Sequence, residues 1–145
     1  MSLNLFKYHT NPETITGFDQ VMNSVPDLAW DHFEDNHEEL RKREHVWAKS
    51  PMYSYLYANY VLNGERFVKG EDAIATDAEY SLYYAAYVLK GERFEKGEDA
   101  IATDAYYSYK YATYVLDGKR VEKIEDAIRG SEYQEKYEEL TGVKL

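Results

Sequence analysis

Cysteine is absent from the 145-residue chain. This absence excludes disulfide bonds and thiolate metal sites, and it fits a reducing compartment. No apolar run approaches the roughly 18 residues that a membrane-spanning helix needs, and the first residues lack the apolar stretch of a signal peptide. We therefore expect a soluble cytoplasmic protein that does not act on membranes.

Basic residues are scarce relative to acidic ones. The chain has 17 lysines and arginines against 27 aspartates and glutamates, which gives a formal net charge of −10 at pH 7. A negative field repels nucleic acid and anionic lipid surfaces, whereas it attracts basic patches on proteins. We therefore expect a protein partner, with a basic patch favoured as its docking surface, and no direct binding of nucleic acid.

Tyrosine, in contrast, is abundant: the chain has 16, and 13 of them lie between Tyr53 and Tyr114. They belong to a 27-residue segment that occurs as copy one (residues 51–77), copy two (78–104) and copy three (105–131). Copies one and two are identical at 20 of 27 positions, and copies two and three at 16 of 27. A fixed period of this kind is the signature of a repeat architecture. Residues 24–50 form a fainter copy, in which the positions of Tyr57, Tyr60, Phe67 and Ile74 hold Trp30, Phe33, Leu40 and Trp47.

Each copy is predicted to form two helices. A residue that can cap a helix N-terminus precedes the first helix of each copy and recurs after copy three: Ser50, Asp77, Asp104 and Ser131. The first helix is predicted to end at a glycine suited to the left-handed conformation: Gly64, Gly91 and Gly118. A shorter second helix is predicted over residues 68–76, 95–103 and 122–129. The pattern therefore predicts an all-α protein built from short αα-hairpin repeats.

The two ends of the chain differ from the repeats. Residues 1–50 are predicted to form an N-terminal helical cap that includes the degenerate copy. Residues 132–145 are predicted to form a C-terminal capping helix with Tyr133, Tyr137 and Leu140 on its apolar face. Stacked repeats need such caps with a polar outer face. We expect the three parts to form one compact domain.

The repeated pattern is Y-S/A-x-x-Y-A-x-x-V-L-x-G-x-R, followed by an aromatic residue and by G/A-E-x-x-I-x-x-D. Two variable residues separate the aromatic residue from the G/A-E pair. The pattern resembles a short tandem repeat of uncharacterised proteins from tailed bacteriophages and some bacteria. It is also similar in style to the hairpins of tetratricopeptide (TPR) and Sel1-like solenoids, although the TPR period is longer and its Trp-Leu-Gly-Tyr spacing is missing here. The resemblance covers residues 51–131. It implies a phage or bacterial intracellular protein that binds a partner, in the host cytoplasm if it is phage-encoded, and it supplies no catalytic residue.

The positions that differ between copies indicate a recognition surface. At about 100° per residue, Tyr53, Tyr57, Tyr60 and Val61 share one face of the first helix, and we predict that these tyrosines form the core between stacked copies. The variable positions fall in another sector, which we expect to face outward and to bind the partner. This outward row consists of Met52, Leu56, Asn59, Asn63, Glu79, Tyr83, Ala86, Lys90, Tyr106, Lys110, Thr113 and Asp117. A solvated face without a function is the alternative.

Arginine and acidic residues recur with the same period. We predict structural ion pairs from Arg66, Arg93 and Arg120 to Asp72, Asp99 and Asp126 or to nearby helix-end carbonyls, with a row of anion-binding guanidiniums as the alternative. An acidic rim is predicted from Glu65, Glu71, Asp72, Glu92, Glu98 and Asp99. This rim motivates a second hypothesis, an acidic nucleic-acid mimic that blocks a DNA- or RNA-binding groove. Ordinary solubility explains the charge equally well.

Histidine occurs only in the first third of the chain, as His9, His32, His37 and His45. Glu34 and His37 match half of a di-iron helix motif, but the second Glu-x-x-His and two further carboxylates are missing. The serines of the repeats have no histidine in their own copies to act as a base. A metal- or small-ligand-binding protein that uses this His/acid cluster is therefore only a further alternative.

We predict a non-enzymatic protein–protein interaction module without a catalytic residue, a cofactor or a bound metal. The resemblance to phage repeats favours a phage-encoded modulator or inhibitor of a host or defence protein. The acidic mimic and the ligand-binding protein remain the two alternatives.

Overall fold

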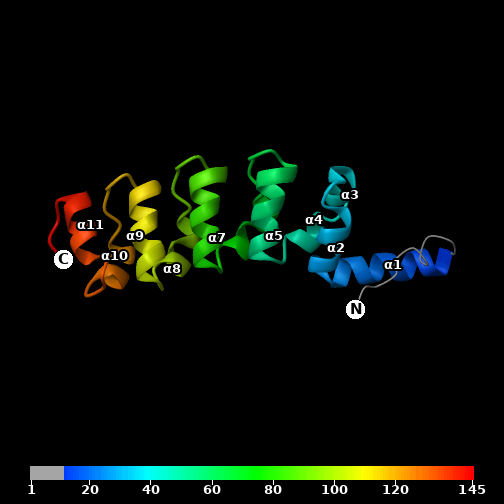
Figure 1. Cartoon of the computed structure of the whole chain (residues 1–145), viewed down its shortest axis with the longest axis horizontal. Helices are drawn as coiled ribbons and strands as arrows, with labels where there is room; N and C mark the ends of the chain where they lie inside the picture. The colour runs from blue at the N-terminus through cyan, green and yellow to red at the C-terminus, as the bar shows by residue number, and fades with distance from the viewer. Residues whose placement is uncertain (1–11) are drawn as a thin grey trace. The chain divides into compact units, whose positions relative to one another are not determined.

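The computed structural model describes residues 12–145, with their side chains from Gly17 onward. The described residues form helices joined by short loops and contain no strand, which confirms the all-α class (Figure 1). Within residues 12–145, no helix combines the length and the hydropathy that crossing a bilayer requires. The described residues divide into two compact units, one that ends at Trp47 and one that begins at Ala48.

The first unit contains four helices among its described residues: α1 (Pro12–Ser24), α2 (Pro26–Phe33), α3 (His37–Arg41) and α4 (Glu44–Trp47). Its core includes Trp30 and Trp47, whose ring centroids lie 5.0 Å apart, and the Trp47 indole donates a hydrogen bond of 2.8 Å to the Leu40 carbonyl. The Asn36 side chain caps α3 by accepting a bond of 3.2 Å from the Glu39 amide. The faint repeat positions therefore supply much of this core.

In the second unit, the first helix of each copy widens before it ends. Copy one has α5 (Pro51–Leu56) followed by a π-helical turn, η2 (Tyr57–Val61), and copy two has α7 (Ala78–Tyr83) followed by η4 (Tyr84–Val88). Copy three has an uninterrupted α9 (Ala105–Tyr114), but it ends with the same i→i+5 bond, from the Leu116 amide to the Tyr111 carbonyl at 3.0 Å. All three first helices therefore end in a wide turn.

The predicted caps occupy their expected places. Ser50, Asp77 and Asp104 each accept a hydrogen bond from the backbone amide three residues later. Ser131 instead accepts from the Tyr133 amide, two residues later, and α11 (Gln134–Thr141) begins after it. Gly64, Gly91 and Gly118 have positive φ angles, and so does the residue before each of them. The first helices therefore begin and end where the repeat pattern predicts.

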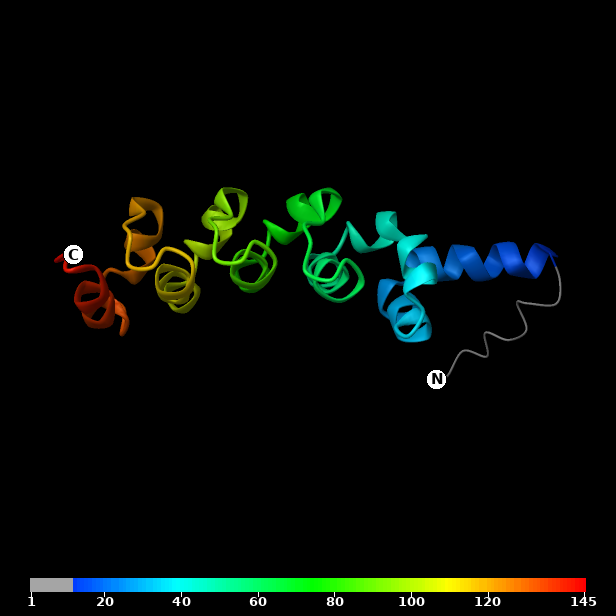
Figure 2. The ribbon, with the colours of Figure 1, turned by 90° about the horizontal axis from the view of Figure 1, so that it is seen from above.

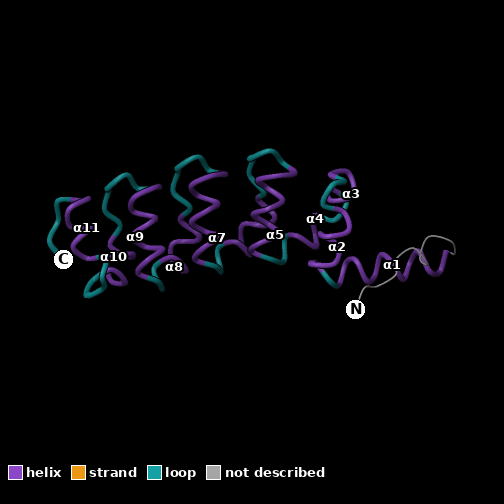
Figure 3. The backbone as a smooth tube through the Cα atoms, viewed as in Figure 1, coloured by secondary structure: helices purple, strands orange, loops and turns teal. Residues whose placement is uncertain are grey.

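The second helices are short and partly 3-10. They comprise η3 (Val68–Gly70) with α6 (Glu71–Ile74), η5 (Glu95–Gly97) with α8 (Glu98–Ile101), and α10 (Glu122–Ile128). Figure 3 shows the loops that separate them from the first helices. A Cβ atom on Gly97 would lie 2.4 Å from the Ser81 Oγ and 2.6 Å from the Phe94 Cδ1. Copies one and two therefore need glycine here to let the second helix approach the first.

Neighbouring copies pack against each other in sequence order. Helix α7 contacts α5 on one side and α9 on the other, and α9 also contacts α11 (Figure 1). The second helices form a second row, since α6 contacts η5 and α8 contacts α10 (Figure 2). Serine side chains link the copies, as in the bond of 2.9 Å that the Ser81 hydroxyl donates to the Ile74 carbonyl. The unit is thus built from lateral contacts between successive copies.

A buried Tyr–Glu–Arg cluster joins each copy to the element that follows it. Between copies two and three, Arg93 donates two bonds of 2.8 Å to the Glu98 carboxylate, and the Tyr111 hydroxyl donates a third bond of 2.8 Å. The same hydroxyl accepts a bond of 3.0 Å from the Phe94 amide. The equivalent clusters are Arg66–Glu71–Tyr84 and Arg120–Glu125–Tyr137. Because Tyr137 lies on α11, the C-terminal helix uses the same contact as a repeat.

The predicted ion pairs of these arginines with aspartate are therefore wrong by one residue. Glu71, Glu98 and Glu125 accept the arginine bonds and are only 2–3% exposed. The aspartates one position later point to solvent, where Asp72 pairs with Lys96 at 2.9 Å and Asp99 with Lys123 at 2.8 Å. The buried position needs the longer glutamate side chain because it must also meet a tyrosine of the next element.

Burial in these clusters controls tyrosine ionisation. Burial, followed by the hydrogen bond to a glutamate carboxylate, raises the pKa of Tyr84, Tyr111 and Tyr137 above the ordinary value of 10.0. The folded state therefore favours the neutral phenols, and this stability is present below pH 10 and is lost as the pH rises above it.

We expect the free energy of unfolding to fall as the pH is raised through 10, because the unfolded chain ionises tyrosines that the folded chain keeps neutral. Denaturant titrations at several pH values on both sides of 10 measure this dependence. In the variant Tyr111→Phe the dependence should be weaker, since one linked phenol is gone. If the free energy of unfolding of Tyr111→Phe depends on pH as strongly as that of wild type, the Tyr111 phenol is not one of the groups responsible.

The exposure of Tyr60 corrects the predicted core. Tyr53 and Tyr57 are buried as expected, but Tyr60 is 61% exposed, and its equivalents Tyr87 and Tyr114 are 62% and 60% exposed. The period of an α-helix places Tyr60 on the face of Tyr57, but this position is exposed in all three copies, on the uninterrupted helix α9 as well as in the π-helical turns η2 and η4. Each copy therefore presents the tyrosine at this position to solvent.

Candidate functional site

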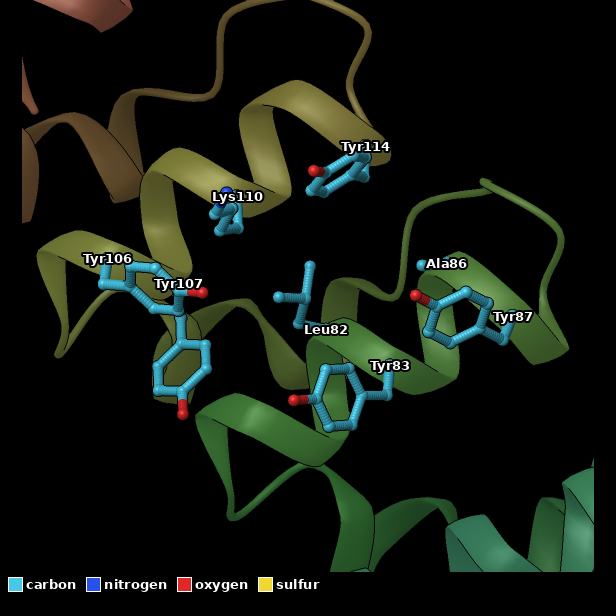
Figure 4. Close-up of a pocket in the computed structure, with 8 residues that line it drawn as sticks. All are labelled: Leu82, Tyr83, Ala86, Tyr87, Tyr106, Tyr107, Lys110 and Tyr114. Carbon is cyan, nitrogen blue, oxygen red and sulfur yellow. The ribbon is translucent and has the colours of Figure 1, made fainter.

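A hollow of about 330 Å³ opens between the first helices of copies two and three. Figure 4 shows the side chains of α7 and η4 on one wall facing those of α9 on the other. The lining residues are Leu82, Tyr83, Ala86, Tyr87, Tyr106, Tyr107, Lys110 and Tyr114. Tyrosine rings therefore form most of the lining, and Lys110 is its one charged residue.

Leu82 explains why the hollow lies at this junction. The equivalent residue in copy one is Tyr55, whose ring centroid lies 5.9 Å from Tyr80 and 5.8 Å from Tyr83, so that its ring occupies the space. The equivalent residue in copy three is Tyr109, which stacks on Tyr133 at 5.5 Å. Leucine is shorter than tyrosine, and the position is buried in copy two. The exchange of one ring for an isobutyl group leaves the space open.

The walls are held by contacts between aromatic rings. Tyr83 and Tyr87 lie 6.2 Å apart by ring centroid on one side, and Tyr106 meets Tyr107 edge to face at 5.2 Å on the other. Tyr87, Tyr106 and Tyr114 are exposed. Large rings with few rotatable bonds lose little conformational entropy on binding, which suits them to recognition surfaces. The hollow thus has an aliphatic floor and exposed aromatic walls.

Lys110 lies between two of these rings. Its Nζ atom is 5.5 Å from the ring centroids of both Tyr106 and Tyr114, within the range of a cation–π contact. Among the described residues, no carboxylate forms an ion pair with Lys110. The side chain is half-buried, so its ammonium group is positioned but remains accessible.

Tyr83 is fixed by a hydrogen bond at the edge of the hollow. Its hydroxyl donates a bond of 2.8 Å to the Glu79 carboxylate, one turn earlier on α7. This bond, together with partial burial, raises the pKa of Tyr83 to about 12. The phenol is therefore neutral near pH 7, and its hydroxyl is already engaged, so the ring is what it offers to a ligand.

None of the outward-row residues is buried, and four of them line the hollow: Tyr83, Ala86, Tyr106 and Lys110. The structure places three more in exposed left-handed turns that follow the first helices: Asn63, Lys90 and Asp117. The remaining members are half-buried on the first helices, outside the lining: Met52, Leu56, Asn59, Glu79 and Thr113. The row as a whole is therefore accessible, but only its part between copies two and three is hollowed.

Four lining residues were missed by the sequence pattern. The helical period assigns Tyr87 and Tyr114, the equivalents of Tyr60, to the core, and the outward row does not include Leu82 or Tyr107. Leu82 could have been found from the sequence, because copy two has leucine where copies one and three have tyrosine, at Tyr55 and Tyr109. The exposure of Tyr87 and Tyr114 recurs at the same position in every copy, and the helical period alone does not predict it.

The predicted acidic rim is only partly on the surface. Glu65 and Glu92 are exposed, and Asp72 and Asp99 are exposed but paired with lysines of the following copy. Glu71 and Glu98 are buried in the Tyr–Glu–Arg clusters, so their assignment to the rim is corrected. Much of the repeated negative charge therefore serves contacts between copies.

The predicted His/acid cluster is dispersed in the structure. His9 lies outside the described residues, His32 packs against Phe18 and Phe33, and His37 begins α3 in solvent. Among residues 17–145, no three histidine or acidic side chains are grouped as metal ligands. His45 borders a second hollow of about 320 Å³ with Asp19, Asn23, Glu39, Lys42 and Arg43.

Arg43 and Lys42, the two cationic side chains of that second hollow, already form ion pairs. Arg43 bonds to Glu39 at 2.7 Å and to Asp19 at 3.3 Å, and Lys42 bonds to Glu39 at 2.9 Å. The Arg43 guanidinium also lies 4.1 Å from the centroid of the Phe33 ring. These contacts stabilise the first unit, and they leave the tyrosine-lined hollow as the stronger candidate site.

Comparison of the chain with protein-family models, with curated proteins and with solved structures finds no match in any of the three. The function is therefore argued from the site itself.

Proposed function

We propose that the chain is a non-enzymatic protein-binding module, a solenoid of short αα-hairpins in the style of TPR and Sel1-like repeats. Its partner site is the tyrosine-lined hollow between copies two and three. The lining of the hollow carries this proposal, since tyrosine is enriched at protein interfaces and the rings of Tyr87, Tyr106 and Tyr114 are exposed. The lateral packing of the copies supports the solenoid, because it holds the two walls at a fixed separation.

The chemistry of the hollow favours binding over catalysis. Its polar groups are phenol hydroxyls and one ammonium, and the carboxylate nearest to its rim, Glu79, is bonded to Tyr83. Catalysis by nucleophilic attack with proton transfer needs a base beside a nucleophile. The residues that line the hollow contain no such pair. The acidic mimic has less support, because Glu71 and Glu98 are buried. The resemblance to phage repeats extends the proposal to a modulator of a host or defence protein in the host cytoplasm.

The variant Leu82→Tyr tests the proposal with a residue that the repeat already accommodates. Tyrosine occupies the equivalent positions 55 and 109, so the change should fill the hollow and alter the free energy of unfolding by less than about 1.5 kcal/mol. Loss of a central interface pocket typically costs more than about 2 kcal/mol, so recovery of the partner should fall at least about tenfold. Affinity capture from extracts of the source cells, compared between wild type and variant by quantitative mass spectrometry, measures this.

Leu56→Tyr is the matched control. It makes the same chemical change outside the hollow, at a position where copy two already has Tyr83. Partners captured by wild type and by Leu56→Tyr but not by Leu82→Tyr would support the site. Equal capture by all three proteins would rule the hollow out.

A further inference from the structure

The hollow differs in charge from the junction that precedes it, and this difference indicates what it binds. The positions of Tyr106 and Lys110 are occupied in copy two by Glu79 and Tyr83. Between copies one and two, the corresponding surface therefore has a carboxylate and no ammonium. Between copies two and three, the residues that line the hollow include an ammonium and no carboxylate, and the Glu79 carboxylate at the edge is bonded to Tyr83. A positive charge is thus added at the one of these two junctions where Leu82 opens the space.

Lys110 is also unusual in how its charge is held. Two other lysines of the repeats pair with acidic groups, Lys96 with Asp72 and Lys123 with Asp99. Lys110 instead contacts the faces of Tyr106 and Tyr114. In a chain with 27 acidic and 17 basic residues, an ammonium group without a carboxylate partner attracts an anionic group from outside. An apolar floor lies within the same hollow, formed by Leu82 and Ala86.

We propose that the hollow, as the partner site of the proposed function, recognises an acidic segment of a protein in which an aromatic side chain stands beside a carboxylate. The aromatic side chain packs over Leu82 between the tyrosine walls, and the neighbouring carboxylate pairs with Lys110. Charge complementarity selects an acidic segment even though the chain as a whole is acidic. Exposed rings stand near both ends of the α9 wall, at Tyr106 and Tyr114, so an extended chain can continue past the hollow in both directions.

The test uses two blocked tetrapeptides, acetyl-Ala-Phe-Asp-Ala-amide and acetyl-Ala-Phe-Asn-Ala-amide, which differ by one charge. Each is titrated into the full-length, ¹⁵N-labelled chain while backbone amide chemical shifts are recorded. For a ligand of this size we expect saturable shifts in α7, η4 and α9 with a dissociation constant on the order of 1 mM. The aspartate peptide should bind about two- to fivefold more tightly than the asparagine peptide, as expected for a partly exposed ion pair.

Three variants locate the two contacts. Leu82→Tyr should abolish the shifts from both peptides, because it fills the space for the aromatic ring. Lys110→Met should reduce binding of the aspartate peptide to the level of the asparagine peptide. Lys136→Met is the matched control, since the Lys136 Nζ also lies over a tyrosine ring, 5.9 Å from the centroid of Tyr133, but outside the hollow. It should leave both titrations unchanged.

Two results would overturn the inference. One is equal affinity for the two peptides, or an unchanged preference in Lys110→Met. The other is the absence of saturable shifts around the hollow. If either occurs while Leu82→Tyr still loses its captured partner, the hollow binds protein by another chemistry and the proposed function survives. If Leu82→Tyr keeps every partner, the proposed function fails even where a peptide binds.

Discussion

Replacing Glu98 with alanine is expected to lower the free energy of unfolding by about 3 kcal/mol, the low end of the range for breaking a buried ion pair. The carboxylate accepts two bonds from Arg93 and one from Tyr111, and it is 2% exposed. Without it, the buried Tyr111 hydroxyl loses its acceptor. The Arg93 side chain is 46% exposed, so its guanidinium can be hydrated when Glu98 is absent, which keeps the loss of stability near the low end of that range. Denaturant unfolding followed by circular dichroism measures the change.

The adjacent residue gives the control for this experiment. Asp99 also pairs with a basic residue, Lys123, but its side chain is 83% exposed. Surface pairs contribute less than about 1 kcal/mol, so Asp99→Ala should have a small effect. Similar losses in Glu98→Ala and Asp99→Ala would show that the buried cluster does not hold the copies together.

The loss of stability in Glu98→Ala should also depend on pH. Burial raises the pKa of Glu98, but the hydrogen bonds from Arg93 and Tyr111 outweigh it and hold the pKa below its ordinary value of 4.5. The stability contributed by the charged form is therefore present above pH 4.5 and is lost as the pH falls through the lowered pKa. The difference between wild type and Glu98→Ala should shrink in that direction.

Replacing Gly97 with isoleucine is expected to destabilise the chain by about 3 kcal/mol, near the upper end for overpacking a core. The first atom added would meet Ser81 and Phe94 at 2.4–2.6 Å. Copy three carries isoleucine at this position, Ile124, and there the residue equivalent to Phe94 is the smaller Val121. The two positions therefore fill one volume between them. Copy two fills it with a large residue and a glycine, Phe94 and Gly97, and copy three fills it with two branched residues, Val121 and Ile124.

A double-mutant cycle tests this exchange. Phe94→Val alone should cost about 2 kcal/mol through the cavity that it leaves. The double variant should be more stable than the sum of the single effects by at least about 1 kcal/mol, because the isoleucine occupies the space of the ring. Full recovery is not expected, since copy three accommodates Ile124 beside an uninterrupted α9, whereas the first helix of copy two ends in the π-helical turn η4. Strictly additive effects would show that the two positions do not share a space.

The repeat period predicted much of the fold because local rules act within each copy. Ser50, Asp77 and Asp104 cap helices by hydrogen bonds that reach only three residues ahead, and Gly64 lies in a turn whose backbone favours glycine. Such features are decided by neighbours in the sequence, and a pattern repeated every 27 residues makes them easy to detect. The all-α class and the ends of the first helices could therefore be predicted from these local features.

The remaining features depend on contacts between copies, which a pattern within one copy does not contain. Arg93 pairs with Glu98 rather than with Asp99, and the Tyr111 hydroxyl of the next copy donates to the same carboxylate. Tyr87 is 62% exposed in the π-helical turn η4 and Tyr114 is 60% exposed on the regular helix α9, so the helical period does not decide their exposure. The hollow depends on a missing ring at Leu82, and a missing group is visible only when the junctions between copies are compared.

The most direct test of the binding site is the affinity of a partner, recovered by affinity capture and then purified, for wild type and Leu82→Tyr, measured by isothermal titration calorimetry. The proposed site predicts a dissociation constant at least about tenfold weaker for the variant, while Leu56→Tyr binds like wild type and all three proteins unfold at similar denaturant concentrations. Equal dissociation constants for wild type and Leu82→Tyr would contradict it.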